Sequence, residues 1–391
     1  MNMKQFLRDI AIISAGQGAP QGDSNYCDNG TPFIKAGNME HLSSGGSLNE
    51  IQKVSETVAK SHKLKLYPKG TVLFAKSGMS CLKGYVYVLP REAYVVSHLA
   101  CITPNEEISD YLRYYFEYHK PNQLVKDAAY PSISLSDIGA LEIDIKDEQS
   151  RESIIETLKS AEKLIDLRKQ ELLALDDLIK ARFVEMFGDP VINSKHLSTM
   201  PMTDVCEIID GDRGKNYPTA DEFTYDGYCL FLNAKNVTAS GFNFDNCMFV
   251  SREKDKALKN GKLTRGDVVL TTRGTIGNLA FYTDEIPFEN VRINSGMVIL
   301  RMKQDIVDEI YFIEQFKMQL NDIKKKIASG SAQPQLPIST MNKIQVLAPN
   351  IDEQKVFAEF VKQIDKSKVV VQKALDEAQL LFDSLMQKYF G

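Results

Sequence analysis

The segment Lys69-Gly70-Thr71-Val72-Leu73-Phe74-Ala75-Lys76-Ser77-Gly78 recurs without a gap, 196 residues further along, as Arg265-Gly266-Asp267-Val268-Val269-Leu270-Thr271-Thr272-Arg273-Gly274. Both copies contain an apolar, partly β-branched run that glycines bound on each side. This pattern is typical of a strand that opens into a loop. The match suggests that the chain contains one structural unit twice.

Four weaker matches follow the same order and support a duplication. The offset is 203 residues for Pro131 and Pro334, and 205 for Gln149 and Gln354, so insertions have accumulated in loops. A solenoid would have a much shorter period. The four pairs are Ile12–Gly16 with Ile208–Gly211, Phe33–Met39 with Phe231–Val237, Tyr130–Ser136 with Gln333–Ser339, and Asp147–Gln149 with Asp352–Gln354.

The first ~145 residues of each unit are rich in strand and turn signals and include some predicted helix, as at 109–118 and 307–327. After them the pattern of each unit becomes helical. From Asp147 the chain has no Gly or Pro until Gly188-Asp189-Pro190, which predicts a helix that stops there. Apolar residues follow 3,4 spacing at Leu158, Ala161, Ile165, Leu172, Leu175, Ile179 and Met186, and again at Phe357, Phe360, Ile364, Val371, Ala374, Ala378, Leu381 and Leu385.

A helix of about 40 residues is about 60 Å long, more than a domain of this size needs. The simplest partner for each apolar stripe is the other stripe, in an antiparallel pair; two helices packed separately on their own domains remain the alternative. The predicted fold class is α+β, with two mixed α/β domains in pseudo-two-fold tandem, separated by two long antiparallel coiled-coil helices. The predicted boundaries are 1–146, 147–188, 189–350 and 351–391.

The composition is that of a globular chain large enough for two or three cores, with 391 residues of which 43% are hydrophobic. A net charge of -5 argues against a protein that simply coats nucleic acid. Residues 147–188 carry 10 acidic and 7 basic side chains, whereas residues 1–146 carry 15 of each. The acidity is concentrated on the predicted helix, so basic loops remain available elsewhere.

Several kinds of site have no motif in the sequence. The six cysteines form no C-x-x-C pair and the histidines are scattered, so we expect reduced thiols and no metal site. There is no N-P-P-[YFW] motif or glycine-rich methyl-donor loop, and Gly211–Asn216 does not satisfy G-x-x-x-x-G-K-[ST]. We therefore predict no catalytic centre and no cofactor. The charged first residues and the lack of any apolar run of ~18 residues predict a cytoplasmic protein that does not enter the membrane.

The order of these motifs, repeated twice, resembles the specificity subunits of type I restriction-modification systems over essentially the whole chain. The resemblance rests on the strand at 266–274, the Gln-Pro-x-Leu segment at 333–336, the Asp-Glu-Gln helix entry and the Phe-Gly helix end. It implies two target-recognition domains that read a bipartite double-stranded DNA target, one half-site per domain. It also implies two methyltransferase (modification) subunits and restriction/motor subunits as partners, which supply the chemistry.

DNA readout needs Arg, Lys, Asn or Gln on loops, with Ser, Thr and backbone groups for phosphate. Matched positions that differ between the copies are the better candidates for base contacts because two half-sites usually differ; Ser77 against Arg273 and Ser132 against Gln335 lead this set. Matched positions that agree, such as Asn38 and Asn236, suit structural or phosphate roles. The predicted DNA-binding residues are Lys35, Asn38, Lys76, Ser77, Tyr130, Ser132, Arg213, Lys215, Asn233, Lys235, Thr272, Arg273, Thr275, Gln333 and Gln335, with Arg252 and Arg292 as further basic candidates.

Two other functions remain open at this point. The chain could be the DNA-recognition module of a related restriction or defence system with other enzymatic partners. It could also be an interaction scaffold whose globular parts bind something other than DNA. A steep salt dependence of DNA affinity would exclude the scaffold.

Overall fold

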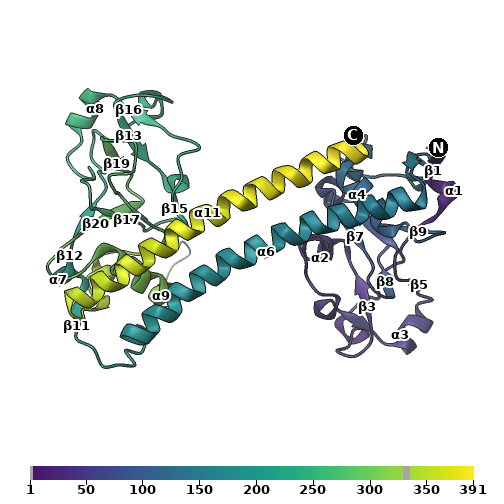
Figure 1. Cartoon of the computed structure of the whole chain (residues 1–391), viewed down its shortest axis with the longest axis horizontal. Helices are drawn as coiled ribbons and strands as arrows, with labels where there is room; N and C mark the ends of the chain where they lie inside the picture. Colours follow the sequence, from purple (N-terminus) through teal and green to yellow (C-terminus); the bar gives the residue numbers. More distant parts are fainter. Residues whose placement is uncertain (1–2, 329–334) are drawn as a thin grey trace. The chain divides into compact units, whose positions relative to one another are not determined.

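The computed structural model describes residues 3–328 and 335–391 (Figure 1). The chain divides into two compact units. Unit 1 contains the described residues up to Arg168 together with Lys373–Gly391, and unit 2 is Lys169–Gln372. Both divisions fall inside a long helix, so each unit consists of a globular part and a portion of both helices.

The core of unit 1 is a four-stranded antiparallel sheet of order β2-β9-β6-β7. One of its two central strands, β6, lies within the repeated segment Lys69–Gly78, and Val72, Leu73 and Phe74 in it are fully buried. A second sheet, β4-β3-β8-β5, contains one parallel pair, β3 with β8. The bounds are β2 Ala11–Ala15, β3 Thr31–Ile34, β4 Lys53–Val54, β5 Leu66–Tyr67, β6 Val72–Ala75, β7 Val86–Val88, β8 Ala93–Val95 and β9 Leu99–Pro104.

Helices and a short two-stranded sheet complete unit 1. Strands β1 (Met3–Phe6) and β10 (Glu142–Ile145) pair antiparallel and bring the start of the chain beside the segment that leads into the first long helix. The shorter helices are α1 Leu7–Ile10, α2 Met39–Ser43, α3 Glu56–Ser61, α4 Ser109–Tyr118 and α5 Leu135–Gly139.

Unit 2 repeats this arrangement. Its main sheet is β12-β20-β17-β18, and β13 lies between β16 and β19, with β13 and β19 parallel. Strand β11 pairs with β21 as β1 does with β10. The strands are β11 Thr199–Pro201, β12 Cys206–Asp210, β13 Cys229–Leu232, β14 Val237–Thr238, β15 Gly241–Phe242, β16 Phe249–Val250, β17 Val268–Thr271, β18 Leu279–Phe281, β19 Val291–Ile293, β20 Met297–Met302 and β21 Gln345–Leu347. The helices are α7 Met202–Val205, α8 Arg252–Ala257, α9 Glu309–Ala328 and α10 Ile338–Met341.

The strand registers confirm the duplication and correct one detail of it. Val72 pairs with Ile102, and Val268 pairs with Leu300, so the two central strands are equivalent. Ile13 also pairs with Ile102, and Ile208 with Leu300. Ile13 therefore matches Ile208, whereas aligning the identical residues of the two segments matched Ile12 with Ile208. The pattern of inward-facing positions fixes the register of a strand, so the structural match is the correct one.

The two predicted long helices are present, as α6 (Glu148–Phe187) and α11 (Ile351–Phe390), with 40 residues each. In unit 1, Ile154 and Leu158 of α6 share a core with Met386 and Phe390 of α11. In unit 2, the first residues of α11 pack against the last residues of α6: Phe357 contacts Phe183, and Lys368 pairs with Asp176. This order is antiparallel, as predicted.

The buried face of these helices differs from the predicted stripe at several positions. Phe183 and Phe187 are buried where we expected Met186 to carry the contact, and in α11 Leu381 is 51% exposed whereas Val361, Met386 and Phe390 are buried. Near its ends each helix also packs against a domain, so the buried face is wider than a two-helix seam.

In the part of the chain that the structure describes, no helix is long and apolar enough to cross a membrane. The six cysteines are free thiols; four are buried, and Cys27 and Cys247 are partly exposed.

Candidate nucleic-acid interface

The loop that follows β17 carries Arg273 on the surface of unit 2. The backbone N–H groups of Thr272 and Arg273 donate to the carbonyl of Gly296 at 2.8 and 3.2 Å, and Leu336 N–H donates to the carbonyl of Thr272 at 2.9 Å. Arg273 and Gln335 form an isolated antiparallel bridge. The two side chains proposed from the repeat are thus on adjacent, hydrogen-bonded segments, and both residues are exposed.

Arg213 joins this pair around a shallow cavity of about 290 Å³, which Asp210, Arg273 and Gln335 also line. The Arg213 guanidinium donates to Asp210 Oδ1 at 3.0 Å and to the carbonyl of Ser295 at 3.2 Å, so its position is fixed. Two guanidinium groups and a carboxamide are the donors that read guanine and adenine edges or bind phosphate. The structure therefore gathers these three predicted residues, together with the predicted Thr272, around one cavity.

Asp212 supports the loop that presents Arg213 and Lys215. Its carboxylate accepts hydrogen bonds from the N–H groups of Gly214 at 2.9 Å and Lys259 at 2.6 Å. The Gly214 hydrogen bond, with those from Lys259 and Asn260, holds the pKa of the Asp212 carboxyl below its ordinary value. The glycine-rich segment of this loop thus forms a turn around the carboxylate of Asp212.

Unit 1 has the same backbone arrangement with different side chains. Ser77 and Ser132 form the matching antiparallel bridge, Lys76 N–H donates to the carbonyl of His98, and Ile133 N–H donates to the carbonyl of Lys76. The pairs Ser77/Arg273 and Ser132/Gln335 therefore occupy equivalent positions. Tyr130, two residues before Ser132, is 82% exposed.

His98 lies in this region of unit 1 and was missed in the sequence. Its Nδ1 is 2.8 Å from Ser77 Oγ, and the residue is exposed. His98 lies outside the segments that resemble each other in the two copies, and it matches a glycine, Gly296. Its position at the start of the strand that pairs with β6 was the only available signal.

Several other predicted residues have structural roles. Asn38 and Asn236 each accept a hydrogen bond from the backbone N–H three residues earlier, that of Lys35 at 2.8 Å and of Asn233 at 3.0 Å, and close a short helical turn. The buried Thr272 hydroxyl donates to the carbonyl of Gly296 at 3.0 Å.

The remaining predicted residues that the structure describes are partly or fully exposed. Lys35 Nζ donates to Gln52 Oε1 at 2.7 Å, and Lys76 and Asn233 are partly exposed. Lys215, Lys235 and Thr275 are exposed on loops. Gln333 lies outside the described residues.

Arg292 cannot act as a basic loop residue. It is 5% exposed and lies on β19, where its Nε donates to Asp255 Oδ1 at 2.6 Å and its other nitrogens donate to three backbone carbonyl groups. The sequence does not distinguish a buried arginine with a distant carboxylate partner from an exposed one. Arg252, the other additional candidate, is exposed and its guanidinium lies 4.6 Å from the ring centre of Tyr228.

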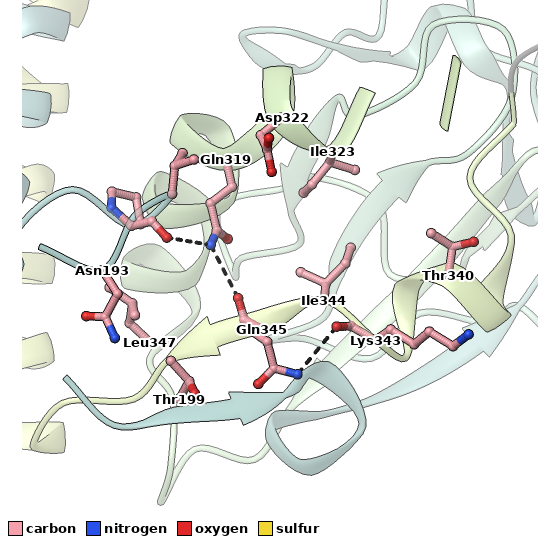
Figure 2. Close-up of a pocket in the computed structure, with 12 residues that line it drawn as sticks. Asn193, Thr199, Gln319, Asp322, Ile323, Thr340, Lys343, Ile344, Gln345 and Leu347 are labelled. Carbon is pink, nitrogen blue, oxygen red and sulfur yellow. Dashed lines mark hydrogen bonds between the residues drawn. The ribbon is translucent and has the colours of Figure 1, made fainter. Parts of the chain in front are cut away.

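A larger cavity of about 460 Å³ in unit 2 contains none of the predicted DNA-binding residues. Figure 2 shows Gln319 of α9 at its wall, donating to the carbonyl groups of Pro190 at 3.0 Å and Gln345 at 3.3 Å. Helix α9 has 20 residues, whereas its counterpart α4 has 10. The cavity is lined by residues of the extra turns, including Gln319 and Ile323.

The duplicated α+β domains and paired long helices define a class of protein already seen in solved structures. The chain is similar over its full length to a type I restriction-modification S subunit from M. genitalium, with 15% identity and a TM-score of 0.58, covering 96% of that chain. It is also similar over its full length to a chain from a structure of type I R-M complex assembly and conformational transition, with 14% identity, 97% coverage and a TM-score of 0.59. At these identities the similarity establishes the fold.

The family follows from the sequence. The model of the type I restriction modification DNA specificity domain matches residues 2–176 and 195–378, and the chain belongs to this family. The MjaIX specificity subunit of Methanocaldococcus jannaschii is 29% identical over 174 residues. That match spans 42% of this chain and 38% of the relative's length.

Proposed function

We propose that this chain reads a bipartite duplex DNA target, with one half-site for each domain, and leaves the chemistry to other subunits. The observation that carries the proposal is the pair of equivalent loops, one with Ser77 and Ser132 and the other with Arg273 and Gln335. A fold that repeats its backbone but changes its exposed polar side chains suits two half-sites of different sequence. Its membership in the specificity family supports the same function.

We propose the domain limits that the sequence pattern predicts. Target-recognition domain 1 is 1–146 and domain 2 is 189–350, with the spacer helices at 147–188 and 351–391. The compact units of the structure combine each domain with parts of both helices. A domain exchanged between relatives would therefore need compatible helix residues as well.

The proposed partners are two methyltransferase subunits and the restriction subunits that join them. Family membership supports these partners, and apolar side chains that are exposed along the two helices are available to contact them. On α6 they are Leu164, Leu167, Leu173, Leu178 and Val184, and on α11 Val356, Val369, Val370, Leu380 and Leu381. We also propose that the chain acts in the cytoplasm, as expected for a subunit of this family.

The test is the substitution Arg273→Ala in the complex purified with its own subunits. If Arg273 makes a bidentate contact to guanine, specific binding weakens by about 1–3 kcal/mol, or about 5- to 150-fold. A mobility-shift titration on a duplex carrying the methylated motif of the source genome measures this loss. Lys343→Ala, which removes an exposed cation of the same unit, is the control and leaves specific binding within twofold.

Two results would count against the proposal. Unchanged affinity for Arg273→Ala removes this residue from the interface. A wild-type complex that binds no duplex, or binds with no dependence on salt, excludes DNA reading and favours an interaction scaffold.

A further inference from the structure

The turn between β8 and β9 differs between the two copies in one informative way. In unit 1, Leu99 N–H donates to the carbonyl of Val96 at 3.0 Å, and in unit 2 Met297 N–H donates to the carbonyl of Asn294 at 3.3 Å. Strand pairing of Ala75 with Leu99 and of Thr271 with Met297 places the two turns in register. His98 therefore stands where the second copy has Gly296.

The adjacent loop differs in the opposite sense. Arg273 replaces Ser77, and a Cβ atom added to Gly296 would lie 3.8 Å from the Cβ of Arg273. Side chains on the two loops therefore leave the backbone next to each other. Unit 2 has a long cation on the first loop and no side chain at Gly296, whereas unit 1 has a short hydroxyl on the first loop and an imidazole at the matching position, His98.

A third position changes together with these two. Arg213 comes two residues after Gly211, and its counterpart two residues after Gly16 is Gly18, where an added Cβ would meet open space. In unit 2, Arg213 donates to the carbonyl of Ser295 in the turn itself. Both arginines of the second site are thus replaced by small residues in the first, and the exposed polar ring next to Ser77 belongs to His98.

We propose that His98 is a specificity-determining residue of domain 1, contacting a base edge in the position that Arg273 occupies in domain 2. The inference rests on the proposed function. Ser77 Oγ engages Nδ1 at 2.8 Å and fixes the ring, which leaves Nε2 to donate to guanine O6 or N7 or to accept from an exocyclic amine. The two half-sites are consequently read by different chemistry, an imidazole in one and guanidinium groups in the other.

The experiment enriches bound duplexes from a randomised pool with the purified wild-type complex and with His98→Ala and Arg273→Ala complexes. We expect a two-part motif for the wild type. His98→Ala lowers discrimination at one or two base pairs of one half at least tenfold and leaves the other half unchanged, which also shows that the protein is folded. Arg273→Ala does the reverse. His62→Ala alters an exposed histidine of the same unit and keeps the full motif.

A double substitution tests the exchange directly. Ser77→Arg combined with His98→Gly gives unit 1 the residues of the second copy at two of the three changed positions, and the expected result is a shift toward guanine in the half that His98→Ala relaxes. Retention of the full motif by His98→Ala, or relaxation of the same half by His98→Ala and Arg273→Ala, overturns the inference. If His98→Ala enriches nothing, His98→Gln replaces it: a motif altered in one half supports the inference, and an intact motif or loss of both halves overturns it. A wild-type complex without a motif instead contradicts the proposed function.

Discussion

The carboxylate of Asp212 organises the loop that presents Arg213 at the candidate interface. Backbone N–H groups of Gly214, Lys259 and Asn260 donate to it, and the residue is 9% exposed. A largely buried carboxylate that accepts several N–H groups stabilises the fold more in its charged form than in its protonated form. The carboxylate therefore connects this loop to the segment that contains Lys259 and Asn260.

Asp212→Asn is expected to lower the free energy of unfolding by about 1.5–3 kcal/mol at pH 7, the usual range for hydrogen bonds to a charged group. Since the hydrogen bond from Gly214 and its neighbours lowers the folded-state pKa, the stabilisation is present above the unfolded-state pKa of about 4 and is lost as pH falls through the folded value. Urea unfolding at pH 7, 5 and 3 should show the difference between wild type and variant shrinking with acidity. Asp221→Asn, on an exposed turn nearby, is the control; an equal difference at all three pH values would contradict the argument.

Among single residues, the sequence identified those that lie beside a repeated segment and missed those whose partners are distant in the chain. Ser77 and Arg273 could be paired because each follows a strand whose apolar pattern repeats. His98 could not, because its match is a glycine and its partner Ser77 is 21 residues away. Arg292 was misjudged for the related reason that its carboxylate partner, Asp255, lies 37 residues earlier in the chain.

The long helices are the elements that the sequence defines best. Their existence follows from two long apolar stripes without Gly or Pro, and their antiparallel order is the simplest pairing of those stripes, but the buried face near each end could not be predicted from periodicity. Phe183 contacts Phe357 of the other helix at 5.4 Å and also Tyr311 of α9 at 5.4 Å, measured between ring centres. A side chain that packs against both the other long helix and a domain helix does not follow the 3,4 spacing of a two-helix interface.

Phe357→Ala is the substitution that tests this aromatic cluster. The side chain is fully buried among Phe183, Phe187 and Tyr311, so its removal leaves a cavity and should cost about 3–5 kcal/mol. The neighbouring Val356 is 58% exposed, and Val356→Ala should change stability by less than about 0.5 kcal/mol. Chemical denaturation followed by far-ultraviolet circular dichroism compares the two. Similar midpoints for both variants would show that the helix ends do not depend on the cluster.

Over the whole chain, the duplication extends to the way each long helix ends. Phe390 packs on Tyr111 of α4 with ring centres 5.2 Å apart, and Phe187 packs on Tyr311 of α9 at 4.9 Å. Tyr111 and Tyr311 both lie in the first turn of equivalent helices. The Phe-Gly residues at the two helix ends thus occupy equivalent sites, and we call each site, with its tyrosine, a socket. The repeat indicated the equivalent helix ends but did not identify the tyrosine partners.

Equivalent sockets predict the behaviour of a fragment that ends at Gly188. Such a fragment lacks α11, so Tyr111, Ile154 and Leu158 lose Met386 and Phe390 from their core. Phe187 of a second copy has the chemistry to enter the Tyr111 socket, and the gain in buried apolar surface favours a dimer. Light scattering should give twice the fragment mass at micromolar concentration, and Phe187→Ala should shift the fragment toward monomer. A folded, strictly monomeric fragment would contradict this prediction. It would show that the core of unit 1 is stable without a second helix and that the Tyr111 socket does not bind Phe187 of another copy.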